Sequence, residues 1–139
     1  AFVAVNEDRT RAKEMRDKYL VEYARSTSSF YRFGNKEFAS IEGYEYYGAL
    51  AKTIEKKGIE TFNEFLADLQ IHGTPDEVTE KLQSMVERFD VGSFIIYTSF
   101  GDMPFDVARE NYELFARKVL PRLKDIDTTV SAEPQLSAG

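Results

Sequence analysis

The stretch that decides the fold is residues 71–124, IHGTPDEVTEKLQSMVERFDVGSFIIYTSFGDMPFDVARENYELFARKVLPRLK. Thr74 suits a helix N-cap, Pro75 suits the first helical position, and Glu77 stands three residues after the cap, where it closes a capping box. Apolar residues then recur at spacings of three and four: Val78, Leu82, Met85, Val86 and Phe89. This spacing predicts a helix with one buried face, and Gly92 follows where a left-handed C-terminal turn is expected.

A short apolar run at residues 94–97 predicts a strand that is covered on both faces. Gly101, Asp102 and Pro104 then predict a loop, and a second long helix is expected from residue 105 to about residue 124. A helix–strand–helix unit of this kind is typical of α/β barrels and doubly wound sheets.

Four phrases occur here in order: GTPDEVTEKL at 73–82, FIIY at 94–97, GDMP at 101–104 and ELFARKVLPRLK at 113–124. In this order and spacing they resemble the C-terminal end of bacterial-luciferase-like flavin-dependent monooxygenases. The resemblance extends, more loosely, to residues 2–19. It implies an α/β fold, namely the last two βα units of a (β/α)8 TIM barrel with a helical insertion, dominated by helices when isolated.

The domain boundaries follow from that resemblance. Residues 1–25 are expected to form a βα unit, 26–70 a lid or insertion, and 71–124 the closing helix–strand–helix unit, before a flexible tail at 125–139. A complete barrel takes about 250 residues. With 139 residues, and an opening on the strand-like run FVAV without a methionine, the chain is expected to be the C-terminal part of a longer enzyme.

The first 70 residues follow a simpler pattern. Residues 2–5 predict a strand, Asn6 a helix cap, and the next helix is expected to end near Arg25 under a layer of solvated charges. Residues 26–42 predict a loop. Residues 43–57 predict a helix ended by Gly58, and 59–69 a further helix with an apolar face of Phe62, Phe65, Leu66 and Leu69.

Composition excludes several classes of function. The net charge of −6 and the pI near 4.9 argue against a nucleic-acid partner, because no basic stripe stands out. The absence of cysteine excludes disulfides and thiolate metal sites. No apolar run approaches the roughly 18–20 residues that span a bilayer, and no signal-peptide pattern is present. A soluble, cytoplasmic chain is therefore expected.

Few residues carry an obvious catalytic chemistry. His72 is the one histidine, and a lone histidine at a strand or loop end is expected to be structural. One histidine without cysteine or a carboxylate cluster at ligand spacing predicts no metal site. No P-loop and no G-x-G-x-x-G phrase occurs.

Candidate site residues come from barrel geometry, because active sites lie where the strands end. Thr98, Ser99 and Gly101 are predicted to contact a flavin phosphate or substrate; an ordinary polar loop is the alternative. The aromatic side chains of the predicted loop at 26–42 either anchor the loop to the core or line a pocket. The resemblance supports the second role, as part of a lid. The predicted substrate pocket and lid comprise Asn6, Phe30, Tyr31, Phe33 and Phe100.

The function implied by the resemblance is oxidation of a small organic substrate with reduced FMN and oxygen, with a flavin reductase as partner. An F420-dependent oxidoreductase of the same superfamily is an alternative. A different class of function also remains open, since eight tyrosines and eleven phenylalanines favour a buried interface. In that case the chain is a non-catalytic helical module that forms a homodimer or pairs with a separate barrel half; a homo-oligomer is expected.

Overall fold

The computed structural model describes residues 1–89 and 93–124, and helices dominate it. Two short strands, β1 (Val3–Val5) and β2 (Ile71–Gly73), pair in parallel with Val3 opposite Ile71 and Val5 opposite Gly73. The prediction that helices dominate the chain is thus confirmed. The strand β1 was predicted. Residues 71–73, which form β2, were predicted only as the segment that precedes a helix. The predicted turn at Gly92 and the tail at 125–139 lie outside the described residues.

One continuous helix follows β1. It comprises α1 (Arg9–Met15), the π-helical turn η1 (Arg16–Leu20) and α2 (Val21–Phe30). Its cap is Asp8, whose carboxylate accepts from the backbone N–H groups of Thr10 and Arg11. The prediction that Asn6 caps this helix is wrong, because Asn6 Oδ1 instead accepts from the Asp8 N–H. The two residues act in sequence, Asn6 shaping the turn and Asp8 starting the helix.

The helix also runs five residues further than predicted, through Phe30. Ser28 explains this, because its hydroxyl donates to Arg25 O and, at 2.5 Å, to Asn63 Oδ1 on a later helix. A buried partner therefore outweighs the weak helix propensity of the four consecutive polar residues 26–29. The remainder of the predicted loop contains the 3₁₀ helix η2 (Lys36–Ser40).

Two helices of the insertion confirm their predicted boundaries. α3 (Glu45–Lys57) ends at Gly58, whose φ of +91° is accessible to glycine, and α4 (Ile59–Asp68) follows directly. The predicted apolar face of α4 is only partly covered, since Phe62 and Leu66 are half-buried. Asn63 and Ala67 are buried against α2, while Phe65 and Leu69 are each 55% exposed.

The helix that opens the decisive stretch, α5 (Pro75–Phe89), forms as predicted. Its capping box is present, because Glu77 Oε2 accepts from the Thr74 N–H at 2.8 Å and Thr74 Oγ1 accepts from the Glu77 N–H at 3.4 Å. Val78 and Leu82 are fully buried, whereas Phe89, at the end of the predicted face, is 61% exposed.

The predicted strand at 94–97 is wrong in extent. Only Tyr97 forms a bridge, parallel to Phe2, and Ile95 is 72% exposed. This segment lies on the edge of β1 opposite β2, because Val3 N donates to Tyr97 O while Ile71 N donates to Phe2 O. The predicted barrel fragment makes residues 2–5 and 94–97 consecutive strands, which are neighbours in a barrel, and the bridge between Phe2 and Tyr97 agrees with that. The strand β2 on the other edge of β1 was not predicted.

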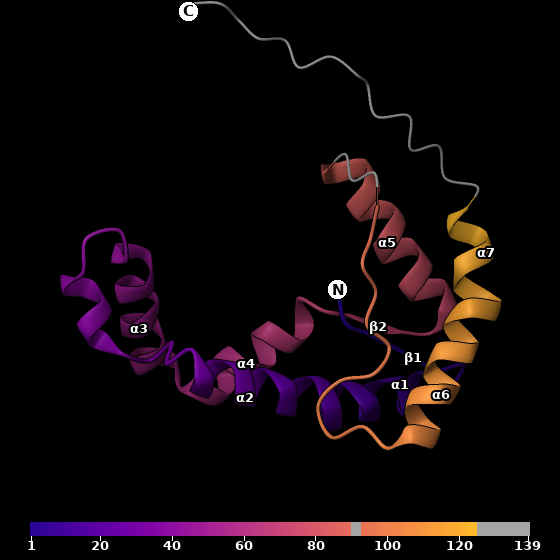
Figure 1. Cartoon of the computed structure of the whole chain (residues 1–139), viewed down its shortest axis with the longest axis horizontal. Helices are drawn as coiled ribbons and strands as arrows, with labels where there is room; N and C mark the ends of the chain where they lie inside the picture. The colour runs from indigo at the N-terminus through magenta and orange to yellow at the C-terminus, as the bar shows by residue number, and fades with distance from the viewer. Residues whose placement is uncertain (90–92, 125–139) are drawn as a thin grey trace, which may run out of the picture.

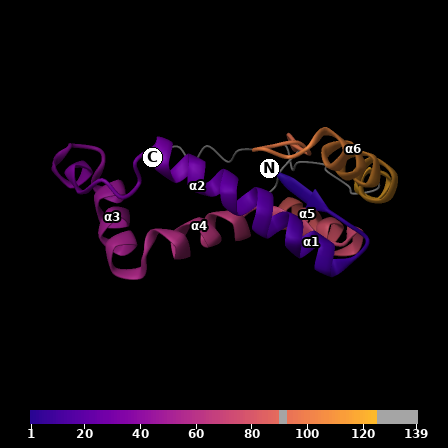
Figure 2. The same ribbon diagram turned by 90° about the horizontal axis from the view of Figure 1, so that it is seen from below.

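A final helix covers this sheet. It comprises α6 (Phe105–Leu114), the π-helical turn η3 (Phe115–Val119) and α7 (Leu120–Leu123), close to the predicted span. Successive β1 residues pack into different clusters: Val3 and Val5 join α5 and η3, and Ala4 joins η1, α2 and Phe100. Helices thus cover both faces of β1, which lies between α1 and α6 (Figure 2).

The molecule is elongated. α3 and α4 lie at one end, and α5, α6 and α7 lie at the other, so that the helices border an open, concave side (Figure 1). The long helix from α1 to α2 connects the two ends. The small sheet lies near the α5 and α6 end, and the core clusters surround it.

Candidate functional site

The candidate site is built around Asn111, a polar residue on α6 that is 2% exposed. Its Oδ1 accepts from the Val5 N–H at 2.8 Å, and its Nδ2 donates to Val3 O at 2.7 Å and Thr98 O at 2.8 Å. One amide thereby holds β1, the end of the 94–98 segment and α6 together. Because both segments run parallel, Asn111 marks the edge of the sheet where they end, which is where ligands bind in parallel α/β folds.

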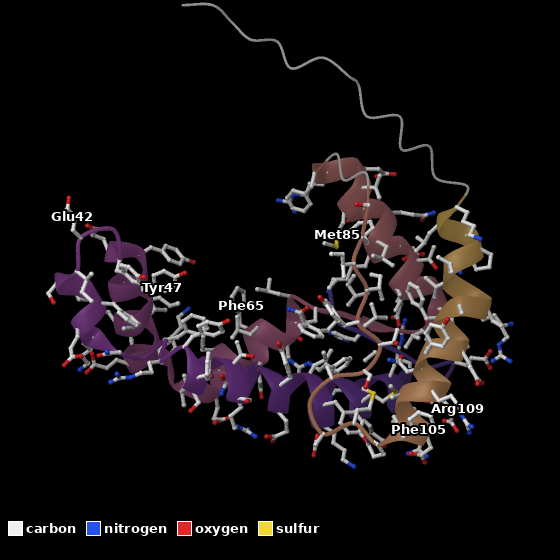
Figure 3. All side chains as sticks on the ribbon, viewed as in Figure 1. Glu42, Tyr47, Phe65, Met85, Phe105 and Arg109 are labelled. Atoms are coloured by element: carbon white, nitrogen blue, oxygen red, sulfur yellow. The ribbon has the colours of Figure 1, made fainter. Side chains whose placement is uncertain are left out.

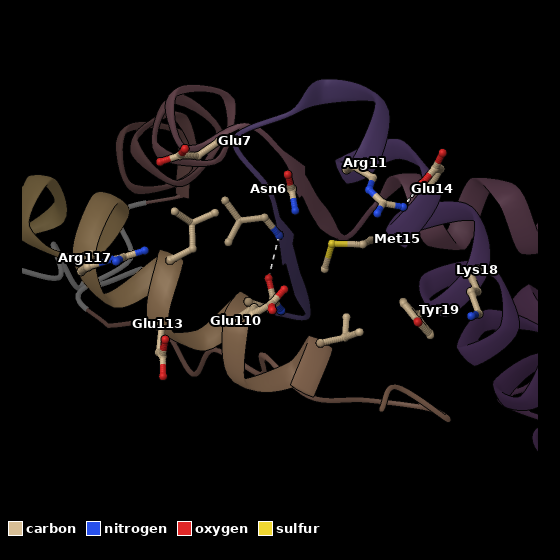
Figure 4. A pocket seen from close by; sticks show the side chains of 14 residues that line it. Asn6, Glu7, Arg11, Glu14, Met15, Lys18, Tyr19, Glu110, Glu113 and Arg117 are labelled. Atoms are coloured by element: carbon tan, nitrogen blue, oxygen red, sulfur yellow. Dashed lines mark hydrogen bonds and ion pairs between the residues drawn. The ribbon is translucent and has the colours of Figure 1, made fainter. Parts of the chain in front are cut away.

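A cavity of about 540 Å³ opens at this edge between α1–η1 and α6–η3, and we refer to it as the α1–α6 crevice (Figure 4). Its volume lies within the range of about 300–1,000 Å³ found for small-molecule pockets. The uncharged part of its lining comprises Val5, Asn6, Met15, Tyr19, Val107, Asn111 and Leu114. Such a floor suits a flat or apolar ligand whose orientation is set by a few polar groups.

The rim of the α1–α6 crevice carries charges of both signs. Its carboxylates are Glu7, Glu14, Glu110 and Glu113, and its cations are Arg11, Lys18 and Arg117. Glu14 pairs with Arg11 at 3.0 Å and raises the pKa of that guanidinium, which stays charged. With four negative and three positive side chains, the rim is close to neutral, and it does not select an anion strongly.

Both π-helical turns border this crevice. Lys18 and Tyr19 come from η1, and Arg117 comes from η3. π-helical turns make up well under about 1% of residues and are frequent at functional sites, because the extra residue re-aims neighbouring side chains. Two such turns facing one cavity strengthen the assignment of this crevice as the site.

The structure brings together only part of the predicted site. Asn6 lines the α1–α6 crevice, and the Thr98 carbonyl is bonded to Asn111 beside it. Ser99 is exposed on the following loop. Gly101 has a φ of +61°, and a Cβ added there would lie 3.7 Å from Tyr19 O, so its close neighbour is the η1 backbone. Neither Ser99 nor Gly101 lines the crevice.

The predicted lid aromatics lie elsewhere. Phe100 is 6% exposed and packs against the Phe2 ring with centroids 5.4 Å apart, so it belongs to the core. Phe30 and Tyr31 are 80% and 58% exposed, and Tyr31 stacks on Phe33. Phe33 in turn contacts rings of α3 and α4 at the opposite end of the molecule from α6 (Figure 1). No aromatic from 30–33 lines the α1–α6 crevice.

Sequence reasoning missed Asn111, Glu110, Met15 and Arg117. A signal for Asn111 was present, because it falls on the apolar stripe of α6 between Ala108 and Leu114, where a polar residue needs a buried partner. The other three look like ordinary helix-surface residues. Only the approach of α1 to α6 makes them neighbours.

His72 lies outside this site, in β2, with its side chain 27% exposed and its Nε2 3.7 Å from Asp68 Oδ1. Burial, followed by the nearby charges of Lys81 and Arg16, lowers the pKa of His72, so it is neutral at pH 7. Within residues 1–89 and 93–124, no three histidine or acidic side chains converge as metal ligands. Over the same residues, no helix has both the length and the apolar character needed to cross a bilayer.

Comparison with protein-family models, with curated proteins and with solved structures found no match for this chain.

Proposed function

We propose that this chain is part of a flavin-dependent oxidoreductase similar to the luciferase-like monooxygenases, and that the α1–α6 crevice contributes to binding of the flavin or its small organic substrate. The observation that carries the proposal is the position of the crevice, at the ends of two parallel segments that Asn111 joins. The family is proposed from the resemblance of the four ordered phrases within residues 73–124. The flavin, FMN or F420, would supply the redox chemistry. If the cofactor is FMN, a flavin reductase is the proposed partner. The proposed location is the cytoplasm.

The residues present fit such a ligand. Met15, Val107 and Leu114 offer an apolar floor for a flat ring system, and the near-neutral rim supplies polar groups that would orient it. The backbone around Asn6 and Val5 is held by bonds to Gly73 O and Asn111, so the floor is rigid before a ligand arrives. In this role the chain binds and orients the ligand and excludes water from one side of it.

The barrel arrangement is a further part of this proposal. Residues 2–5 and 94–97 would be the last two strands of the barrel and therefore neighbours. The parallel bridge between Phe2 and Tyr97 supports this part of the proposal.

The test is an NMR titration of the ¹⁵N-labelled chain with oxidised FMN and, separately, with F420. We expect the amide signals of Asn6, Glu7, Glu110 and Asn111 to shift with one of the two flavins. Glu110→Trp should fill the crevice and raise the flavin Kd at least about tenfold, equivalent to roughly 1.4 kcal/mol. Arg109→Trp, on the neighbouring exposed position, is the matched control and should leave the Kd unchanged. Shifts that are absent, or that persist in Glu110→Trp, would overturn the proposal.

A second candidate function is self-association, and the exposed aromatic side chains of α3 and α4 favour it. Tyr44, Tyr46 and Tyr47 of this region are 47%, 74% and 37% exposed, and Phe65 is 55% exposed. In Figure 3, Tyr47 and Phe65 point toward the concave side, as does Met85 of α5. Apolar side chains gathered in this way mark interaction surfaces.

A further inference from the structure

A second cavity, of about 530 Å³, lies where β2 meets α1, the end of α4 and α5, and we call it the basic cavity. Four cationic side chains line it, Arg9, Lys13, Arg16 and Lys81, against two carboxylates, Asp68 and Glu77. Since His72 is neutral at pH 7, the lining carries a formal charge of four minus two, or +2. The whole chain carries −6, so this cavity is a local reversal of charge.

Both carboxylates of the basic cavity are already engaged. Asp68 Oδ1 accepts from Arg16 Nε at 3.0 Å and Nη2 at 2.7 Å, and the Arg16 side chain is only 13% exposed. Glu77 accepts from the Thr74 N–H and pairs with Arg9 at 2.5 Å. Asp17, just outside the lining, also pairs with Lys13 and with Arg16, each at 2.7 Å. Three carboxylates therefore face the four cations, which leaves one positive charge in excess.

Lys81 is the anchor of the basic cavity. Its Nζ donates to Asp68 O at 3.0 Å and to Gln70 O at 2.6 Å, so two backbone carbonyls hold the ammonium in place. An ammonium has three N–H groups, and within the described residues these two carbonyls are the acceptors of the Lys81 ammonium. Burial of this ammonium lowers its pKa, which means that an added anion would be stabilised by a poorly hydrated charge.

We propose that the basic cavity binds the phosphate group of a small organic phosphate monoester. The sign of the charge matches, because a phosphate monoester carries about −1.5 to −2 at pH 7 and the four cations exceed the carboxylates that face them by one. The size matches as well, since about 530 Å³ is more than a bare ion needs and leaves room for an organic part beside the Ala12 methyl and Gly73. The site shares no lining residue with the α1–α6 crevice, so it stands independently of the proposed flavin function.

The test is an NMR titration of the ¹⁵N-labelled 139-residue chain at constant ionic strength, with inorganic phosphate and with glycerol phosphate as probes. We expect the amide signals of Gly73, Glu77 and Lys81 to shift, and glycerol phosphate to bind more tightly than inorganic phosphate. Equal affinity for the two probes would overturn the monoester assignment. No shift around the basic cavity with either probe would overturn the site itself.

Variants separate a defined site from a general charge effect. Lys81→Met should raise the Kd for glycerol phosphate by about tenfold or more, because a charge-assisted hydrogen bond is lost. Because Lys81 also donates to two backbone carbonyls, Lys81→Met could disturb the fold. Lys13→Gln is therefore a second variant. The Lys13 side chain is 74% exposed, so this change spares the fold, and it should weaken binding severalfold. The control is Lys118→Gln, which removes one charge from outside the basic cavity. If the control weakens binding as much as Lys13→Gln, the proposal fails.

Discussion

At the scale of single residues, the start of α5 shows how a few side chains set a boundary and couple it to pH. Glu77 satisfies the Thr74 N–H at the helix start and places its negative charge near the positive end of the helix dipole. The hydrogen bond from the Thr74 N–H, followed by the charge of Arg9, lowers the pKa of Glu77 below its ordinary value of 4.5. Folding therefore favours the ionised form of this carboxyl group.

We expect Glu77 to contribute stability that is present above its unfolded pKa and is lost as the pH falls through the lower folded value. Glu77→Gln should cost about 1 kcal/mol of unfolding free energy at pH 7, and the difference from wild type should shrink below pH 4.5. Urea denaturation at a series of pH values measures this. Glu80→Gln, an exposed position of the same helix, is the control; a pH-independent cost at Glu77 would contradict the linkage.

At the scale of elements, buried amides decide which segments lie together. Asn63 accepts from Ser28 and so extends α2 along α4, while Asn111 joins β1, the 94–98 segment and α6. A buried amide that lacks its partners costs more than its bond contributes, so the three bonds of Asn111 exclude alternative registers of α6. Asn63 is less constrained, because its buried Nδ2 meets no partner among the described residues. The apolar residues around Asn111 would tolerate a shift by one turn; its amide would not.

Asn111→Ala should therefore destabilise the chain by about 3 kcal/mol, because the Val5 N–H and two carbonyls lose their buried partner. Glu113→Ala, an exposed change on the same helix, should alter stability by less than about 0.5 kcal/mol. Equilibrium denaturation compares the two. If the two variants are equally stable, Asn111 does not hold these elements together.

At the scale of the whole molecule, the elongated shape leaves apolar side chains on the concave side. Phe65 of α4 points toward this side and is 55% exposed (Figure 3). Leu69, directly after α4, and Phe89 of α5 are also exposed, at 55% and 61%. Covering such side chains stabilises an assembly by about 25 cal/mol for each Å² of apolar surface removed from water. The small sheet also ends on one side in β2, whose outer edge pairs with no other described strand.

We expect the chain to self-associate through this concave side, giving a mass above 15.9 kDa in light scattering at high concentration. The double change Phe65→Glu and Leu69→Glu should shift the equilibrium toward monomer by at least about tenfold, because it removes exposed apolar area and adds like charges. Lys56→Glu, an exposed change on α3, is the control. A monomeric wild type, or association that survives the double change, would contradict the prediction.

The sequence by itself determined the local structure. The capping box of α5, the termination of α3 at Gly58, the strand β1 and the long final helix depend on propensities and spacings that lie within a few residues of one another. For the same reason it placed Asn6 and Thr98 at the ends of parallel segments. Each of these features is settled by neighbours in the chain.

The tertiary structure alone decided the rest. The order β2, β1, residue 97 depends on which backbone groups meet, since Ile71 N and Val3 N both bond to segments distant in the chain. Helix α2 extends because Ser28 meets Asn63, and the rim of the α1–α6 crevice exists because α1 approaches α6. These contacts join residues 35 to 108 positions apart, and no local pattern encodes which distant partner offers the complementary hydrogen bond.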